Sequence, residues 1–156
     1  MNSNNDTSIP SGDERNVSGD GISASALTEL MKRFDGGSMH RYRHDHKSTF
    51  IFTEGVRTVV LAAGADWLLN RLAFDYFPVI KNAFYEDDVR MIQVKLKVDA
   101  QQRRAKLFLK SVWNGRVLKK EEIGDTDFPP GDWYFYIYPG LDNTVFFCEM
   151  LLLTEY

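Results

Sequence analysis

The hydrophobic period of this chain changes once, near residue 91, from that of an amphipathic helix to that of a half-buried strand. Apolar and polar residues alternate along 91–98, strictly so from Ile92 onward. Because successive side chains of a strand point to opposite faces, the valines and the leucine of this run share one face, and Lys95 and Lys97 share the other. The second half of the chain is therefore predicted to form an antiparallel sheet with one apolar face.

Four further segments carry a strand signal. Asn114-Gly115 separates two of them and is the dipeptide most typical of a two-residue hairpin turn. Pro139-Gly140 marks another turn before the last segment. These strands are predicted over 106–112, 116–123, 133–138 and 144–153. Together with 91–98 they predict a meander of four to five antiparallel strands.

The first half of the chain has a helical period. Apolar residues recur every three or four positions in three segments, which Ser23 or Ser25, Thr53 and Asp66 are placed to cap. The polar stretch over 38–48 is predicted to be a loop, and 50–52 is interpreted as a short edge strand. The predicted fold class is α+β, with two or three N-terminal helices packed on one face of the antiparallel meander.

The length of 156 residues suits a single domain. Residues 1–22 are dominated by Asn, Ser, Asp and Gly, which cannot bury enough apolar surface to offset the entropy of ordering them. We predict a disordered tail over 1–22 and a single α+β domain over 23–156. The alternative for the tail is a segment that folds on a partner.

The single cysteine, Cys148, excludes a disulfide scaffold and is expected to be a buried thiol of a late strand. No apolar run approaches the roughly 20 residues that a membrane-spanning helix needs. The first residues lack the basic start and apolar stretch of a secretory signal. We therefore expect a cytoplasmic protein with no membrane partner.

Charge is segregated along the predicted sheet. Residues 90–120 contain ten basic residues against one acid, Asp99, a net charge of +9. Residues 121–156 contain eight acids and no lysine or arginine, a net charge of −8. The overall net charge of −3 thus conceals a strongly polarised domain.

The two-residue period assigns most of the basic side chains of this region to the open face of the sheet, opposite the helices. On the strand over 133–138 the tyrosines are the better outward set, because their hydroxyl groups tolerate solvent. The candidate partner-binding residues are Lys95, Lys97, Arg104, Lys106, Phe108, Lys110, Tyr134, Tyr136 and Tyr138.

A sheet face that combines cations and aromatic rings predicts a binding surface. We expect a non-enzymatic binding module, an adaptor or inhibitor, with an acidic protein as its partner. A single-stranded nucleic acid is the alternative ligand, because basic groups neutralise phosphates and rings stack on unpaired bases. A purely solvated face, in which lysine stems cover tyrosine rings, is also compatible with the pattern. No oligomeric state is predicted.

Three histidines, His40, His44 and His46, lie within seven residues and raise a third function, a metal-dependent enzyme. All three fall on one predicted loop beside two arginines that would repel a cation, whereas structural zinc sites usually draw their ligands from two rigid elements. No phosphate-binding, dinucleotide-binding or nucleophile motif is present. We predict no metal, no cofactor and no catalytic residue.

Several short segments together are similar to a family of small bacterial proteins known only as a domain of unknown function. They are Phe34-x-Gly-Gly, Tyr42-Arg43-His44, 52–56, 63–69, 94–98, 126–129 and 151–156. The resemblance covers the chain from about Leu27 to Tyr156. It implies helices followed by a meander and a prokaryotic or mobile-element source, and it implies no activity.

Overall fold

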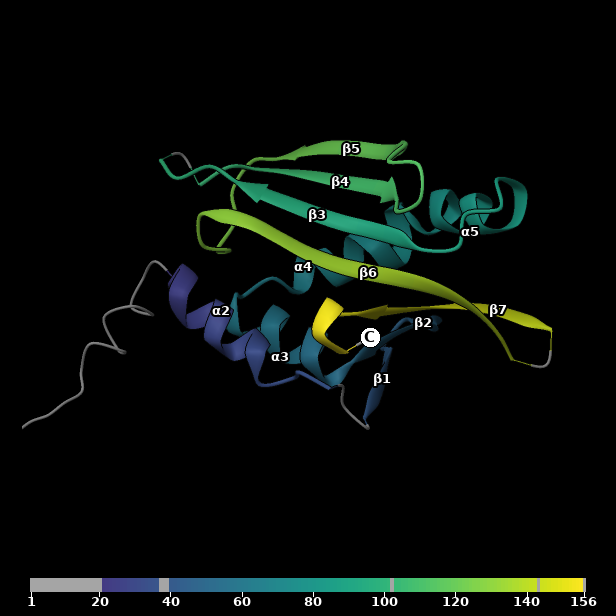
Figure 1. Ribbon diagram of the computed structural model, residues 1–156, viewed down its shortest axis with the longest axis horizontal. Coiled ribbons are helices and arrows are strands. Elements are labelled where there is room, and N and C mark those ends of the chain that lie inside the picture. The colour runs from purple at the N-terminus through teal and green to yellow at the C-terminus, as the bar shows by residue number, and fades with distance from the viewer. Residues whose placement is uncertain (1–20, 37–39, 102, 143, 156) are drawn as a thin grey trace, which may run out of the picture.

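Seven strands form one sheet in the computed structural model, which describes residues 21–36, 40–101, 103–142 and 144–155 (Figure 1). The strand order is β1-β2-β7-β6-β3-β4-β5. All neighbours are antiparallel except β2 and β7, which run parallel. The strands are β1 (Arg41–His44), β2 (Lys47–Thr53), β3 (Ile92–Val98), β4 (Ala105–Ser111), β5 (Val117–Ile123), β6 (Gly131–Asp142) and β7 (Val145–Leu151). The predicted disordered tail lies outside the described residues, except for its last two.

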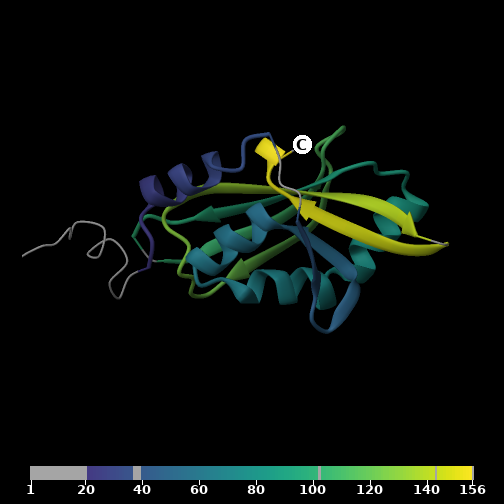
Figure 2. The same cartoon turned by 90° about the horizontal axis from the view of Figure 1, so that it is seen from below.

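Four α-helices occur in the described part of the chain, which confirms the predicted α+β class. They are α2 (Ala24–Lys32), α3 (Glu54–Ala62), α4 (Asp66–Asn70) and α5 (Phe77–Glu86). A π-helical turn, η1 (Arg71–Asp75), links α4 to α5, and a 3-10 turn, η2 (Leu153–Glu155), follows the last strand. Figures 1 and 2 show α3, α4 and α5 on one side of the central strands, with α2 beside α3.

The sheet has seven strands rather than the predicted four to five, because the β1–β2 hairpin joins the five strands that follow the helices. The described residues form four α-helices rather than two or three, and the hairpin precedes three of them, so the helices are not all N-terminal. The predicted loop over 38–48 contains β1 and the start of β2. The segment over 50–52 is not an edge strand either, since β2 lies between β1 and β7. β1 has no hydrophobic pattern, because its buried residue, His44, is polar. The fold buries this ring with hydrogen bonds to Asn70 and His46 and with edge-on contacts to Phe50 and Phe74.

The strands after residue 91 also depart from a simple meander. β6 pairs with β3 rather than with β5, so the chain crosses back after forming the outer strand of the sheet. β5 carries charged residues on both faces, which suits a solvent-exposed edge. β6 presents Trp133, Phe135 and Ile137 to the core, which suits a central position.

Burial alternates residue by residue along β3 and β4, which confirms the predicted orientation of both strands. The core side of β3 contributes Val94 and Leu96, which are completely buried, whereas Lys97 on the other side is exposed. The same holds for β6, where the tyrosines over 134–138 are half-buried and the intervening residues are buried. The sheet therefore has one face covered by helices and one open face.

Local side chains set the helix boundaries. Ser23 Oγ accepts a hydrogen bond from the Ala26 N–H at 3.1 Å and caps α2. Thr53 Oγ1 accepts from the Val56 N–H and caps α3, as predicted. Asp66 is the first residue of α4 rather than its cap, and Pro78 lies in the first turn of α5, where its missing N–H costs little.

Candidate functional site

The predicted basic residues lie on the open face of β3 and β4 or, for Arg104, just before β4. Lys97 is directly opposite Lys106 in the β3–β4 pair, and Lys95 is opposite Phe108. Arg104 immediately precedes β4 and is exposed. Like charges placed directly opposite each other on antiparallel strands are destabilising. The fold therefore tolerates a local concentration of positive charge at this end of the β3–β4 pair.

A hollow of about 460 Å³ lies at one end of the β3-β4-β5 part of the sheet. It is lined by the end of β3, the start of β4 and the end of β5. Lys97, Arg104 and Lys106 line it together with Phe108. Its acidic lining residues are Asp99 and Glu122. The structure thus brings four of the nine predicted partner-binding residues around one concave surface.

The three cations of this hollow outnumber its two carboxylates, and they form no ion pair within the described part of the chain. Lys97, Arg104 and Lys106 make no ion pair there, although Glu122 is the cross-strand neighbour of Lys106. Lys95 differs, because its Nζ lies 3.9 Å from a carboxylate oxygen of Asp132. Lys110 and Lys120 also make no ion pair among the described residues, so the unpaired positive charge of the open face extends beyond the hollow.

Lysine side chains lie over two of the four aromatic rings of the open face, those of Phe108 and Tyr134. The Nζ atoms of Lys110 and Lys120 lie 5.3 and 5.6 Å from the centre of the Phe108 ring. Lys95 Nζ lies 5.8 Å from the centre of the Tyr134 ring. These cation–π contacts fix the lysines and occupy ring faces that a planar ligand would need.

Two of the predicted tyrosines lie away from the hollow. Tyr136 is opposite Gln93, whose Nε2 donates a hydrogen bond to the tyrosine hydroxyl at 3.2 Å. Tyr138 lies further along β6, opposite Glu149 of β7. The nine predicted residues share one face of the sheet, but they do not form one compact cluster.

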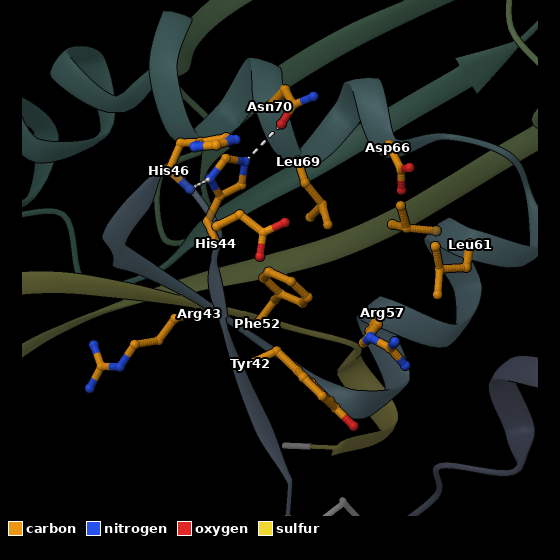
Figure 3. A pocket seen from close by; sticks show the side chains of 12 residues that line it. Tyr42, Arg43, His44, His46, Phe52, Arg57, Leu61, Asp66, Leu69 and Asn70 are labelled. Carbon is orange, nitrogen blue, oxygen red and sulfur yellow. Dashed lines mark hydrogen bonds between the residues drawn. The ribbon is translucent and has the colours of Figure 1, made fainter.

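A second concave site, which the sequence did not predict, lies on the helix side of the β1–β2 hairpin (Figure 3). It is a pocket of about 520 Å³ between this hairpin, α3 and α4. Phe52, Val60 and Leu69 form its buried floor, and Arg57 and Asp66 are exposed at its rim. The helical period does not single out Arg57 or Asp66, because exposed charges are ordinary on the outer face of a helix.

His44 joins the hairpin to α4 at this pocket. Its Nδ1 accepts a hydrogen bond from the His46 N–H at 3.1 Å, so the neutral ring carries its hydrogen on Nε2. That nitrogen lies 2.7 Å from Asn70 Oδ1 and donates to it. Both ring nitrogens are therefore engaged by the protein itself, which assigns His44 a structural role.

The histidines predicted from sequence as a possible metal cluster do not come together as one. Among the residues that the structure describes, no three His, Cys, Asp or Glu side chains are arranged to hold a metal ion. His46 stacks edge-on against His44, with ring centroids 6.2 Å apart. His40 lies before β1, where its carbonyl accepts a hydrogen bond from the Glu54 N–H.

Arg57 is held over an aromatic stack at the pocket. Its guanidinium carbon lies 4.7 Å from the centre of the Tyr42 ring. Tyr42 in turn stacks on Phe52, with ring centroids 6.1 Å apart and planes inclined by 22°. The guanidinium N–H groups of Arg57 make no hydrogen bond within the described part of the chain, so they are available for an anion.

Comparison with known proteins identifies the family. The model of DUF6876, a family of unknown function, matches residues 26–156. The chain belongs to this family. The matched DUF6876 region contains every strand of the sheet, the hollow and the pocket. Searches of curated proteins and of solved structures found no match.

The cysteine of this DUF6876 member and the lengths of its helices bear on what the protein can do. Cys148 is free and completely buried, and burial raises the pKa of its thiol to about 12. A thiol of that pKa is not a nucleophile near neutral pH. No helix in the described ranges is long and apolar enough to cross a membrane.

Proposed function

We propose that the protein is a non-enzymatic binding module whose open sheet face engages an acidic protein partner. This proposal rests on the observation that Lys97 of β3 lies directly opposite Lys106 of β4. The pair contributes repulsion to the isolated fold, and Arg104 adds a third cation to the same hollow. Carboxylates of a partner would pair with these cations and offset their mutual repulsion. The positive electrostatic potential of the cations would also increase the rate at which an acidic partner associates.

An acidic protein suits this face better than a single-stranded nucleic acid does. Proteins that bind single strands without sequence preference stack bases on open aromatic faces. Here Phe108 lies beneath two lysine amines and Tyr134 beneath one, so stacking would first have to break cation–π contacts. Carboxylates can pair with the lysines where they are.

We also propose a bacterial, cytoplasmic setting in which the module serves a mobile element as an adaptor or inhibitor. The single cysteine is free and buried, which is compatible with a reducing compartment. The bacterial or mobile-element source rests on the family resemblance of the sequence. The non-enzymatic assignment rests on the engaged ring nitrogens of His44 and the buried thiol of Cys148.

Quantitative affinity capture from the native host tests the proposal. Wild-type protein is compared with a charge-reversed variant, Lys97→Glu with Lys106→Glu. The matched control, Arg33→Glu with Lys81→Glu, makes the same change in charge at exposed positions of the helical side. Circular dichroism spectra establish that all three proteins are folded.

We expect at least one acidic protein to be captured by the wild type and by the control, and to be lost with the Lys97/Lys106 variant. An equal yield of every captured protein with the charge-reversed variant would contradict the proposal. Capture of nucleic acid in place of protein, lost with the same variant, would support the alternative ligand.

A further inference from the structure

The pocket beside the β1–β2 hairpin carries charges, on Arg57 and Asp66, that form no ion pair among the described residues. We propose that it binds a small amino-carboxylate, an α-amino acid with an apolar side chain. Arg57 would hold the ligand carboxylate, Asp66 its ammonium group, and the floor of the pocket its side chain. This pocket shares no lining residue with the hollow on the open sheet face. The ligand proposal is therefore independent of the proposed acidic protein partner.

Arg57 is prepared for a carboxylate. Its guanidinium is oriented by the Tyr42 ring, and Tyr42 is fixed by its stack on the buried ring of Phe52. No carboxylate pairs with Arg57 in the described part of the chain. An oriented guanidinium offers parallel N–H donors that match the two oxygens of a carboxylate, and little side-chain entropy remains to be lost on binding.

Asp66 supplies the opposite charge from a second rigid element. It begins α4, while Arg57 lies on α3, and both residues line the same pocket (Figure 3). Asp66 makes no ion pair or side-chain hydrogen bond with the residues described here. Arg57 and Asp66 therefore give the pocket a cation and an anion without ion-pair partners among the described residues, the pattern that complements a zwitterion, and Asp45 adds a second carboxylate to the lining.

Apolar side chains lie beneath and beside the pocket, and Leu61 is the one most exposed to a ligand. Phe52, Val60 and Leu69 are buried beneath it, and Leu61 is 51% exposed at its side. The volume of about 520 Å³ falls in the range of small-molecule pockets. An apolar side chain would cover this surface while its two charged groups reached the rim.

Isothermal titration calorimetry with three related probes tests the inference. L-phenylalanine carries both charges, 3-phenylpropionate only the carboxylate, and phenethylamine only the ammonium group. We expect L-phenylalanine to bind with a dissociation constant of about 1 mM or below, and each single-charge analogue to bind about tenfold more weakly or worse. Absence of binding by both L-phenylalanine and L-leucine at about 10 mM would overturn the proposal.

Two variants test which pocket residue binds which charged group of the ligand. Arg57→Ala and Asp66→Asn are each expected to weaken L-phenylalanine about tenfold or more, whereas the controls Arg33→Ala and Asp125→Asn, exposed elsewhere, leave it unchanged. Wild-type affinity in either pocket variant would contradict the assigned role of that residue. Circular dichroism distinguishes loss of binding from loss of folding. A change in L-phenylalanine binding caused by Lys97→Glu with Lys106→Glu would contradict the separation of the two sites.

Discussion

The carboxylate of Glu155 accepts a hydrogen bond from the backbone N–H of Gly55 at 3.1 Å, across 100 positions of the chain. The Thr53 hydroxyl donates to the same carboxylate at 2.5 Å, and the Leu152 N–H donates at 2.9 Å. A negative charge at the start of α3 also complements the helix dipole. The end of the chain therefore stabilises the junction of β2 and α3, which forms one side of the pocket.

Removal of this carboxylate should destabilise the fold. Glu155→Ala leaves the buried Thr53 hydroxyl and two backbone N–H groups without their acceptor, so we expect the free energy of unfolding to fall by about 1–3 kcal/mol. Urea denaturation measures the change. The surface control Glu86→Ala should stay within about 0.5 kcal/mol of wild type, and an equal loss in both variants would argue against a specific role of Glu155.

Gly55 should be required because of Glu155. A Cβ atom at position 55 would lie 2.5 Å from the Glu155 carboxylate, so Gly55→Ala must displace it. We expect Gly55→Ala to lower the midpoint of thermal unfolding in the wild type, and to lower it less in a Glu155→Ala background. Equal shifts in the two backgrounds, measured by calorimetry, would show that the two positions are not coupled.

Asn70 should stabilise the hairpin through His44. Asn70→Ala removes the acceptor of a buried ring N–H, and we expect a cost of about 1–3 kcal/mol in the free energy of unfolding. The same change in a His44→Phe background should cost much less, because no N–H is left unpaired. Equilibrium urea unfolding of the four proteins measures the coupling, and full additivity would contradict the proposed contact.

The thiol of Cys148 should make stability fall at high pH. Burial raises its pKa from 9.0 to about 12, so the native state keeps the proton while the unfolded chain releases it. Its contribution to the free energy of unfolding therefore decreases as the pH rises above about 9, and it levels off above about 12. Cys148→Ala should flatten the wild-type decline between about pH 9 and pH 11, and an identical decline in both proteins would refute this assignment.

The burial of Cys148 also predicts that its thiol reacts slowly with thiol reagents. Native protein should react with a thiol reagent at pH 8 far more slowly than urea-unfolded protein does. Absorbance of the released product follows the reaction. A native rate equal to the unfolded rate would show that Cys148 is accessible.

The strands of the second half were predictable because their information is local. Alternation over 91–98 fixes which face each side chain takes, and Asn114-Gly115 marks the β4–β5 turn. The parallel pairing of β2 with β7 joins Phe50 to Cys148 across most of the chain, and no local pattern specifies it. β1 was not predicted because its buried residue, His44, is polar and is typical of a loop. Its burial depends on a hydrogen bond to Asn70, which is distant in the sequence.

The two candidate sites differ in the same way. Lys97 and Lys106 could be assigned to one face from strand period alone, although their direct opposition required the register. Arg57 and Asp66 could not be found from the sequence, because they converge only through the packing of α3 and α4 against the hairpin. Periodicity determines the face of a residue within its own element, and it carries no information on which elements meet.

A titration with purified probes tests the central claim most directly. The probes are a fluorescein-labelled peptide of about ten glutamates and an oligothymidylate of equal charge, followed by anisotropy from about 50 to about 300 mM salt. We predict that the wild type binds the peptide more tightly than the oligonucleotide, with affinity falling as salt rises. Lys97→Glu with Lys106→Glu should weaken the peptide about tenfold or more, while Arg33→Glu with Lys81→Glu should not. Equal affinity of the Lys97/Lys106 variant and the wild type for the peptide would contradict the account.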